Sequence, residues 1–89
     1  MAAPPAQRDG LEIFVVEDGY VVHDDAAGRV HHLNLTSALV FDLCDGVTGL
    51  EAIAAGVAEA FDLDTAPLDE VSDCVAQLEG EGLLETGGA

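Results

Sequence analysis

One segment, Arg29 to Gly46, constrains this fold most, because it joins a β-rich run to a helix pattern with no loop between them. Asn34 follows the run Arg29 to Leu33 and is a good N-cap, since its side-chain oxygen can accept a hydrogen bond from a first-turn amide. Apolar residues then recur at helical spacing until Asp45-Gly46, where glycine allows the left-handed C-terminal conformation. A strand that turns directly into a helix leaves one side as a sheet edge. We expect this edge to dock another polypeptide.

Two more β-rich runs precede this segment, and together with it they predict a sheet. Leu11 to Val16 and Tyr20 to His23 are dominated by β-branched and aromatic residues, and Asp18-Gly19 between them suits a tight hairpin turn. A second turn at Asp25 to Gly28 leads into Arg29 to Leu33. The three runs therefore predict an antiparallel meander whose last strand is an edge, with Leu33 facing the core.

Helical patterns fill the rest of the chain. Thr48 and Glu51 fit a capping box at the start of a second helix, in which Gly56 would mark a close helix contact. Pro67 suits the first turn of a third helix. The apolar stripe of that third helix is Leu68, Val71, Val75 and Leu78.

The order of these elements predicts an α+β, winged-helix-like fold, with a three-stranded antiparallel sheet followed by three helices. We expect one domain over residues 11–85, with flexible tails at 1–10 and 86–89. Leu83 and Leu84 should tuck back against the core.

Charge excludes several classes of partner. The chain has 18 acidic residues against 2 basic ones, a net charge of -16, so it should repel nucleic acids and anionic membranes. Its 49% hydrophobic content predicts a folded chain. No apolar run is long enough to span a bilayer and no secretory signal is visible, so we expect a cytoplasmic protein.

No motif indicates catalysis or a cofactor. The chain lacks a glycine-rich phosphate loop and a nucleophile elbow, so we expect no enzyme activity. His31 and His32 point to opposite faces of a strand and cannot readily share a metal ion, even with His23 nearby. Cys44 and Cys74 sit in apolar helix patterns, which favours two reduced, buried thiols. We expect no metal and no cofactor.

The segment HHLNLTSALVFDLCDGVTGLEAIAAGVAEAFD, followed by a last helix and a closing GLL at Gly82 to Leu84, resembles the PqqD family. This family is also called the RiPP recognition element, a domain that binds leader peptides of ribosomally made, modified peptides. The matching features are Leu33-Asn34, Asp45-Gly46, Ile53 and the final leucine pair. The resemblance extends over roughly residues 11 to 84.

The resemblance implies a function and a site. In the family, the leader peptide adds as an antiparallel strand to the third β-strand, in a groove beside the third helix. This chain would then be a non-catalytic peptide chaperone that presents a precursor peptide to a modifying enzyme, such as a radical SAM protein or a leader peptidase. The implied binding residues are Arg29, Val30, His31, His32 and Leu33 on the strand, and Glu70, Cys74, Gln77 and Leu78 on the helix.

Another interpretation stays open. The chain could be an acidic adaptor or scaffold that binds a partner enzyme through its helices, with no peptide groove in use. An open edge also allows two copies to pair as a homodimer.

Overall fold

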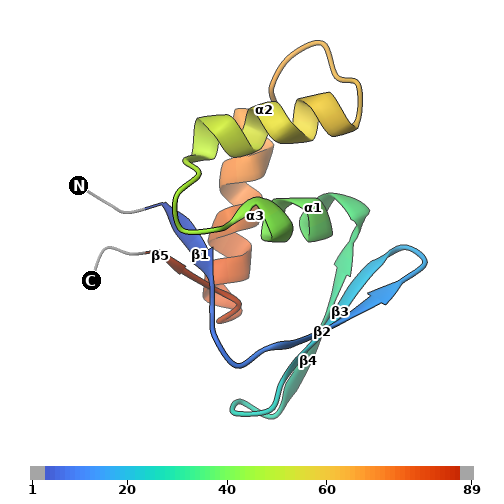
Figure 1. Ribbon diagram of the computed structural model, residues 1–89, viewed down its shortest axis with the longest axis vertical. Coiled ribbons are helices and arrows are strands. Elements are labelled where there is room, and N and C mark those ends of the chain that lie inside the picture. The colour runs from blue at the N-terminus through green and yellow to red at the C-terminus, as the bar shows by residue number, and fades with distance from the viewer. Residues whose placement is uncertain (1–3, 87–89) are drawn as a thin grey trace.

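A three-stranded antiparallel sheet precedes three helices in the computed structural model, which describes residues 4–86 (Figure 1). The elements are β1 (Pro5–Gln7), β2 (Glu12–Val16), β3 (Gly19–Asp24), β4 (Arg29–Asn34), α1 (Leu35–Leu43), α2 (Leu50–Ala60), α3 (Leu68–Gly80) and β5 (Leu84–Thr86). The strand order β2-β3-β4 confirms the predicted meander and the α+β class. The likeness to a winged helix stays a prediction.

The hairpin between β2 and β3 differs from the predicted turn by one residue. Glu17 and Asp18 form the loop, while Gly19 begins β3 opposite Val16. Gly19 has a φ of 144°, and a Cβ atom there would lie 1.8 Å from the carbonyl oxygen of Leu33. Glycine is therefore required at this position because β4 passes so close to it.

Helix α1 contacts β3 and β4 and lies between the sheet and α2 (Figure 1). Leu33 is 3% exposed, which confirms it as the core residue of β4. Val71, Val75 and Leu78 of α3 are buried as predicted, whereas Leu68 is 40% exposed. The buried apolar residues form one cluster: Val22, Leu33, Ala38, Val40, Phe41, Cys44, Ile53, Ala54, Val57, Val71, Val75, Leu78, Leu83 and Leu84.

The ends of α1 agree with the sequence analysis. The Asn34 side chain accepts a hydrogen bond from the amide of Ser37 at 2.9 Å, which confirms the N-cap. Gly46 has a φ of 84°, as expected after the end of the helix. A Cβ atom at Gly56 would lie 3.0 Å from Leu43, so Gly56 does mark a close contact between α1 and α2.

The predicted capping box of α2 is wrong. This helix begins at Leu50 with Gly49 as N-cap, and no side chain caps it. The Thr48 hydroxyl instead donates to the carboxylate of Asp45 at 2.9 Å, and that carboxylate also accepts from the amide of Val47. These three bonds to Asp45, including one from the Thr48 amide, lower the pKa of Asp45. Thr48 therefore closes the loop between the helices.

The N-terminal segment is more ordered than the expected tail. Pro5–Gln7 form β1, which pairs antiparallel with β5 beside the C-terminal end (Figure 1). The side chain of Gln7 donates to the carbonyl of Phe41 at 2.9 Å. A strand of three residues is too short to show a hydrophobic period, so the sequence carried no signal for it. The ends of both predicted tails, residues 1–3 and 87–89, lie outside the described residues.

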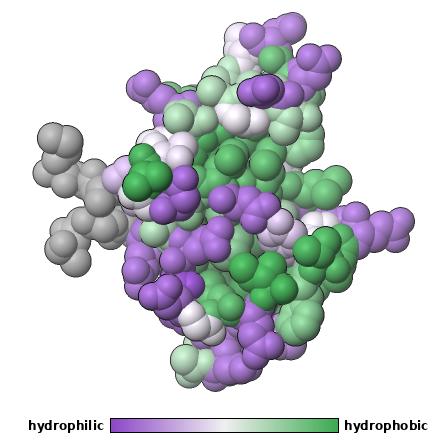
Figure 2. Space-filling view, viewed as in Figure 1, coloured by the Kyte–Doolittle hydropathy of each residue, from purple (hydrophilic) through white to green (hydrophobic). Residues whose placement is uncertain are grey.

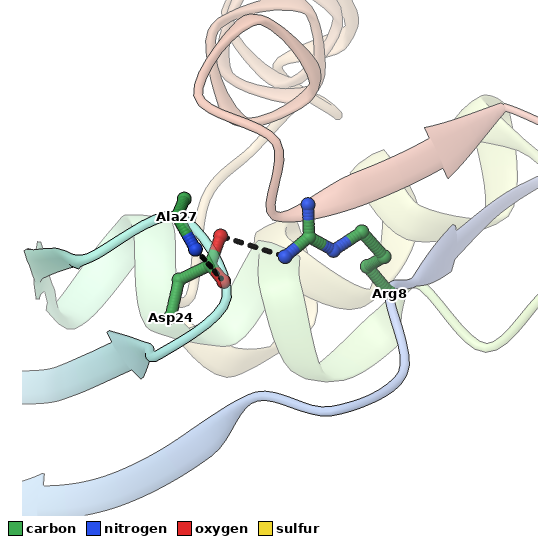
Figure 3. Close-up of polar contacts among 3 residues, drawn as sticks. All are labelled: Arg8, Asp24 and Ala27. Atoms are coloured by element: carbon green, nitrogen blue, oxygen red, sulfur yellow. Dashed lines mark hydrogen bonds and ion pairs between the residues drawn. The ribbon is translucent and has the colours of Figure 1, made fainter.

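An ion pair joins this segment to the main sheet (Figure 3). Nη2 of Arg8 lies 2.6 Å from Oδ2 of Asp24, whose side chain is 1% exposed. The amide of Ala27 donates to the other oxygen of Asp24 at 3.2 Å. Asp24 is thus a buried carboxylate that a cation and a backbone amide both satisfy, which makes its burial tolerable.

We expect Arg8→Ala to lower the free energy of unfolding by about 2 to 4 kcal/mol, because it leaves the buried carboxylate of Asp24 without its cation. Urea unfolding followed by circular dichroism measures the change. The double variant Arg8→Ala/Asp24→Asn should lose less than the sum of the two single variants, because both charges are then removed together. A loss below about 0.5 kcal/mol for Arg8→Ala would contradict this account.

Candidate functional site

The outer edge of β4 is the centre of the candidate site. Strand β4 pairs only with β3, and no other strand in the described part of the chain lies on its outer side. Arg29, Val30 and His32 are exposed, His31 is half-buried, and Leu33 is buried in the core. The predicted strand residues therefore share one edge, but their side chains divide between the two faces of the sheet.

The register indicates which backbone groups of β4 face outward. Val16 and Gly19 close a two-residue loop, and residues that close such a loop form a hydrogen-bonded pair. Hydrogen-bonded and non-bonded pairs then alternate across antiparallel strands. This alternation directs the backbone groups of His31 toward β3 and those of Val30 and His32 toward the open edge.

Three of the predicted residues of helix α3, Glu70, Cys74 and Gln77, form a stripe on its surface. Glu70 and Gln77 are exposed and Cys74 is half-buried, whereas Leu78 is 2% exposed and belongs to the core. The structure thus brings three of the four predicted helix residues to the surface. Since Leu78 lies beneath them, it supports the stripe and does not form part of its surface.

Two side-chain contacts, both missed by the sequence analysis, tie α3 to the strand and to α1. Nδ1 of His31 lies 3.5 Å from a carboxylate oxygen of Glu81, just after α3. Sγ of Cys74 lies 3.7 Å from the hydroxyl of Ser37 in the first turn of α1. Glu81 follows Gln77 by four residues, so the helical period could have indicated it. Ser37 carried no such signal.

An apolar pocket opens between α1, α2 and α3, next to this stripe. It holds about 180 Å³, which is below the usual range for small-molecule sites and suits a single bulky side chain. Its lining includes two predicted site residues, Glu70 and Cys74. The other lining residues are Thr36, Val40, Val57, Phe61, Leu63, Pro67 and Val71. We call it the α1–α3 pocket.

The sequence analysis missed the pocket because several segments form it together. Phe61 is 40% exposed and Leu63 is 46% exposed, although both lie beside a buried cluster. Asp62 between them has a φ of 55°, the only positive φ outside glycine among the described residues. In the sequence, the only indication of the pocket was that two large apolar residues, Phe61 and Leu63, flank the turn at Asp62.

The two thiols differ in their surroundings. Burial raises the pKa of Cys44 to about 12, and this side chain is 0% exposed. Burial also raises the pKa of Cys74, although its contact with Ser37 opposes the rise. Both cysteines are free thiols. A raised pKa lowers the thiolate fraction near neutral pH, so neither residue is poised as a nucleophile.

The histidines do not converge on a common point. Nε2 of His32 lies 3.2 Å from a carboxylate oxygen of Asp18 at the hairpin loop, whereas His31 faces Glu81. Within residues 4–86, no group of three or more histidine, cysteine or acidic side chains is placed to hold a metal ion. The site therefore presents a strand edge, a helix stripe and an apolar pocket.

The fold is that of a small α+β domain, with a three-stranded sheet followed by three helices. Residues 19–84 match the family model of coenzyme PQQ synthesis protein D, PqqD, and the chain belongs to this family. This is the RiPP recognition element family, whose members are non-catalytic and bind precursor peptides as partners of modifying enzymes such as radical SAM proteins. No match was found among curated proteins or among solved structures.

The helices carry one further finding. None of those in the described part of the chain is both long enough and apolar enough to cross a membrane.

The accessibility of the two thiols can be tested by alkylation. With iodoacetamide at pH 8, we expect Cys74 to react roughly tenfold or more faster than Cys44, because Cys44 is fully buried and its pKa is raised to about 12. Both should react more slowly than in urea-unfolded chain. Mass spectrometry of the digested protein measures each rate. Equal rates for the two cysteines in the folded chain would contradict the placement of Cys74 at the pocket.

Proposed function

We propose that this protein captures the leader of a precursor peptide by β-strand addition to β4 and presents it to a modifying enzyme. The observation that carries the proposal is the outer edge of β4, which no strand covers within residues 4–86. The backbone groups of Val30 and His32 are available to a fourth strand. Backbone pairing supplies part of the affinity in this recognition mode, and alternate side chains supply specificity.

Backbone pairing alone is too weak for tight capture. Each net hydrogen bond contributes about 0.5 to 1.5 kcal/mol, and association costs at least several kcal/mol in lost freedom. An apolar anchor must supply the difference. The α1–α3 pocket supports this requirement, because Glu70 and Cys74 line it and Thr36 follows β4 by only two residues.

The polarity of the strand suggests where the anchor lies. An antiparallel peptide would place its N-terminal part near Asn34, which is the end of β4 closest in sequence to the pocket. We therefore propose a leader with one large aliphatic or aromatic residue on the N-terminal side of its paired segment. The net charge of -16 favours a leader that also carries lysine or arginine, mainly through faster association.

The two free thiols support a reducing compartment, and we propose the cytoplasm.

A titration tests the proposed site. The leader region of a candidate precursor peptide is added to the ¹⁵N-labelled protein. We expect amide shifts on Val30 to Leu33 and on Cys74 to Leu78, because those backbones border the proposed groove. Shifts confined to α2 would instead favour an adaptor that does not use the groove.

Proline substitutions test strand addition itself. Val30→Pro and His32→Pro each remove an outward amide, so we expect roughly a fivefold or greater loss of leader affinity, equivalent to about one hydrogen bond. Proline is tolerated at an edge whose amide faces solvent, so helical content should remain. Fluorescence anisotropy measures the affinity.

Val15→Pro is the matched control. It places proline at an outward position of β2, the opposite edge of the same sheet, where Val15 is 79% exposed. Leader affinity should not change in this variant. Unchanged affinity in both Val30→Pro and His32→Pro would count against the edge model.

A further inference from the structure

The face of the sheet that points away from the helices is largely apolar and uncovered. The register places Phe14, Val21 and His32 in one row across the three strands. It places Glu12, His23 and Val30 in a parallel row on the same face. The side chains of Phe14, Val16 and Val30 are 48%, 36% and 63% exposed. We call this surface the outer face. Its residues are Glu12, Phe14, Val16, Val21, His23, Val30 and His32.

Nothing in the described part of the chain covers the outer face. Val22 and Leu33 point to the opposite face and are 0% and 3% exposed, because α1 packs on that side. The ring of Phe14 contacts His23 edge to face, with centroids 5.0 Å apart, which fixes its direction. Figure 2 shows green, apolar side chains in the region where Figure 1 draws this sheet, with purple, polar ones beside them.

Strand β2 adds to this exposed apolar area. All five of its residues are exposed, and the register puts Phe14 and Val16 on the outer face, whereas Ile13 and Val15 lie on the opposite face. Three of the ten large apolar side chains that are exposed in residues 4–86, those of Phe14, Val16 and Val30, lie on the outer face. A contiguous apolar patch with a polar rim usually marks a protein interface.

The charge around the patch indicates the kind of partner. Glu12, Glu17, Asp18 and Asp25 are exposed on β2 or on the loops that flank the sheet. Of the two basic residues in the chain, Arg8 is already paired with Asp24. A second copy would bring another charge of -16 against this rim, so electrostatics opposes self-association. A partner with an apolar centre and a lysine or arginine rim is complementary.

We propose that the outer face docks the modifying enzyme, through an apolar enzyme surface that is rimmed by basic residues. The identity of this partner rests on the proposed function. The leader would occupy the edge of β4, and the enzyme would cover the face centred on Phe14. The leader would use the backbone groups of Val30 and His32, and the enzyme would use the side chains of the outer face, so both ligands can be bound together.

The test uses the full chain and a candidate modifying enzyme, a radical SAM protein from the same genome. Isothermal titration calorimetry compares the wild type with Phe14→Thr/Val16→Thr, which places residues of high strand propensity at both positions but removes most of the apolar contact. We expect the dissociation constant for the enzyme to rise at least about tenfold, while leader affinity stays within about twofold of the wild type. Raising the salt from about 50 to 500 mM should weaken wild-type binding to the enzyme.

Two further variants control for general effects. Val47→Thr changes an apolar side chain that is 80% exposed in the loop between α1 and α2, and it should leave the enzyme affinity unchanged. Glu17→Lys reverses one charge of the rim without touching the core. It should weaken enzyme binding about threefold at low salt. This variant therefore tests the proposal even if the double variant folds poorly.

Three results would overturn the proposal. The first is an absence of binding between the wild type and the enzyme. The second is an enzyme affinity of Phe14→Thr/Val16→Thr within about twofold of the wild type. The third is a wild-type dimer in sedimentation that this variant converts to monomer. Failure of the proposed function looks different, because the leader would then cause no amide shifts along β4.

Discussion

The junction at Asn34 is the constraint on which the rest of the structure depends, because β4 becomes α1 there without a loop. The side chain of Asn34 accepts from the amide of Ser37, which ends the strand and begins the helix. Leu33 before this point and Ala38 after it enter the same buried cluster. Helix α1 is thereby held against the inner face of the sheet, and no strand in the described residues covers the outer edge of β4.

The three-stranded sheet carries different chemistry on each of its exposed parts. Its β4 edge offers outward backbone groups, which suits an extended peptide, and the lining of the α1–α3 pocket includes Thr36, two residues beyond β4. Its outer face offers apolar side chains within an acidic surround, which suits a folded and basic partner. A small domain buries a small fraction of its surface, so it needs most of its apolar residues to form a stable core. Apolar residues left outside that core are accordingly informative about function.

Sequence reasoning reached the features that depend on neighbours in the chain. Asn34 as a cap and Gly46 after the helix follow from the short-range geometry of helix ends. It failed where local signals competed or were absent. Thr48 fits the capping-box pattern, but its hydroxyl donates to the carboxylate of Asp45 and does not cap α2. Glu81 and Ser37 approach the site residues only because α3 crosses near both β4 and α1.

The sequence by itself determined the order of three strands and three helices, the membership of Leu33 in the core and the acidic character of the surface, because these depend on period, capping and composition. Tertiary structure alone decided that Pro5–Gln7 pair with the far end of the chain, that Arg8 neutralises Asp24, and that a pocket opens beside Cys74. Each of these joins segments distant in sequence. Such contacts form only when the core brings the segments together, so no local pattern records them.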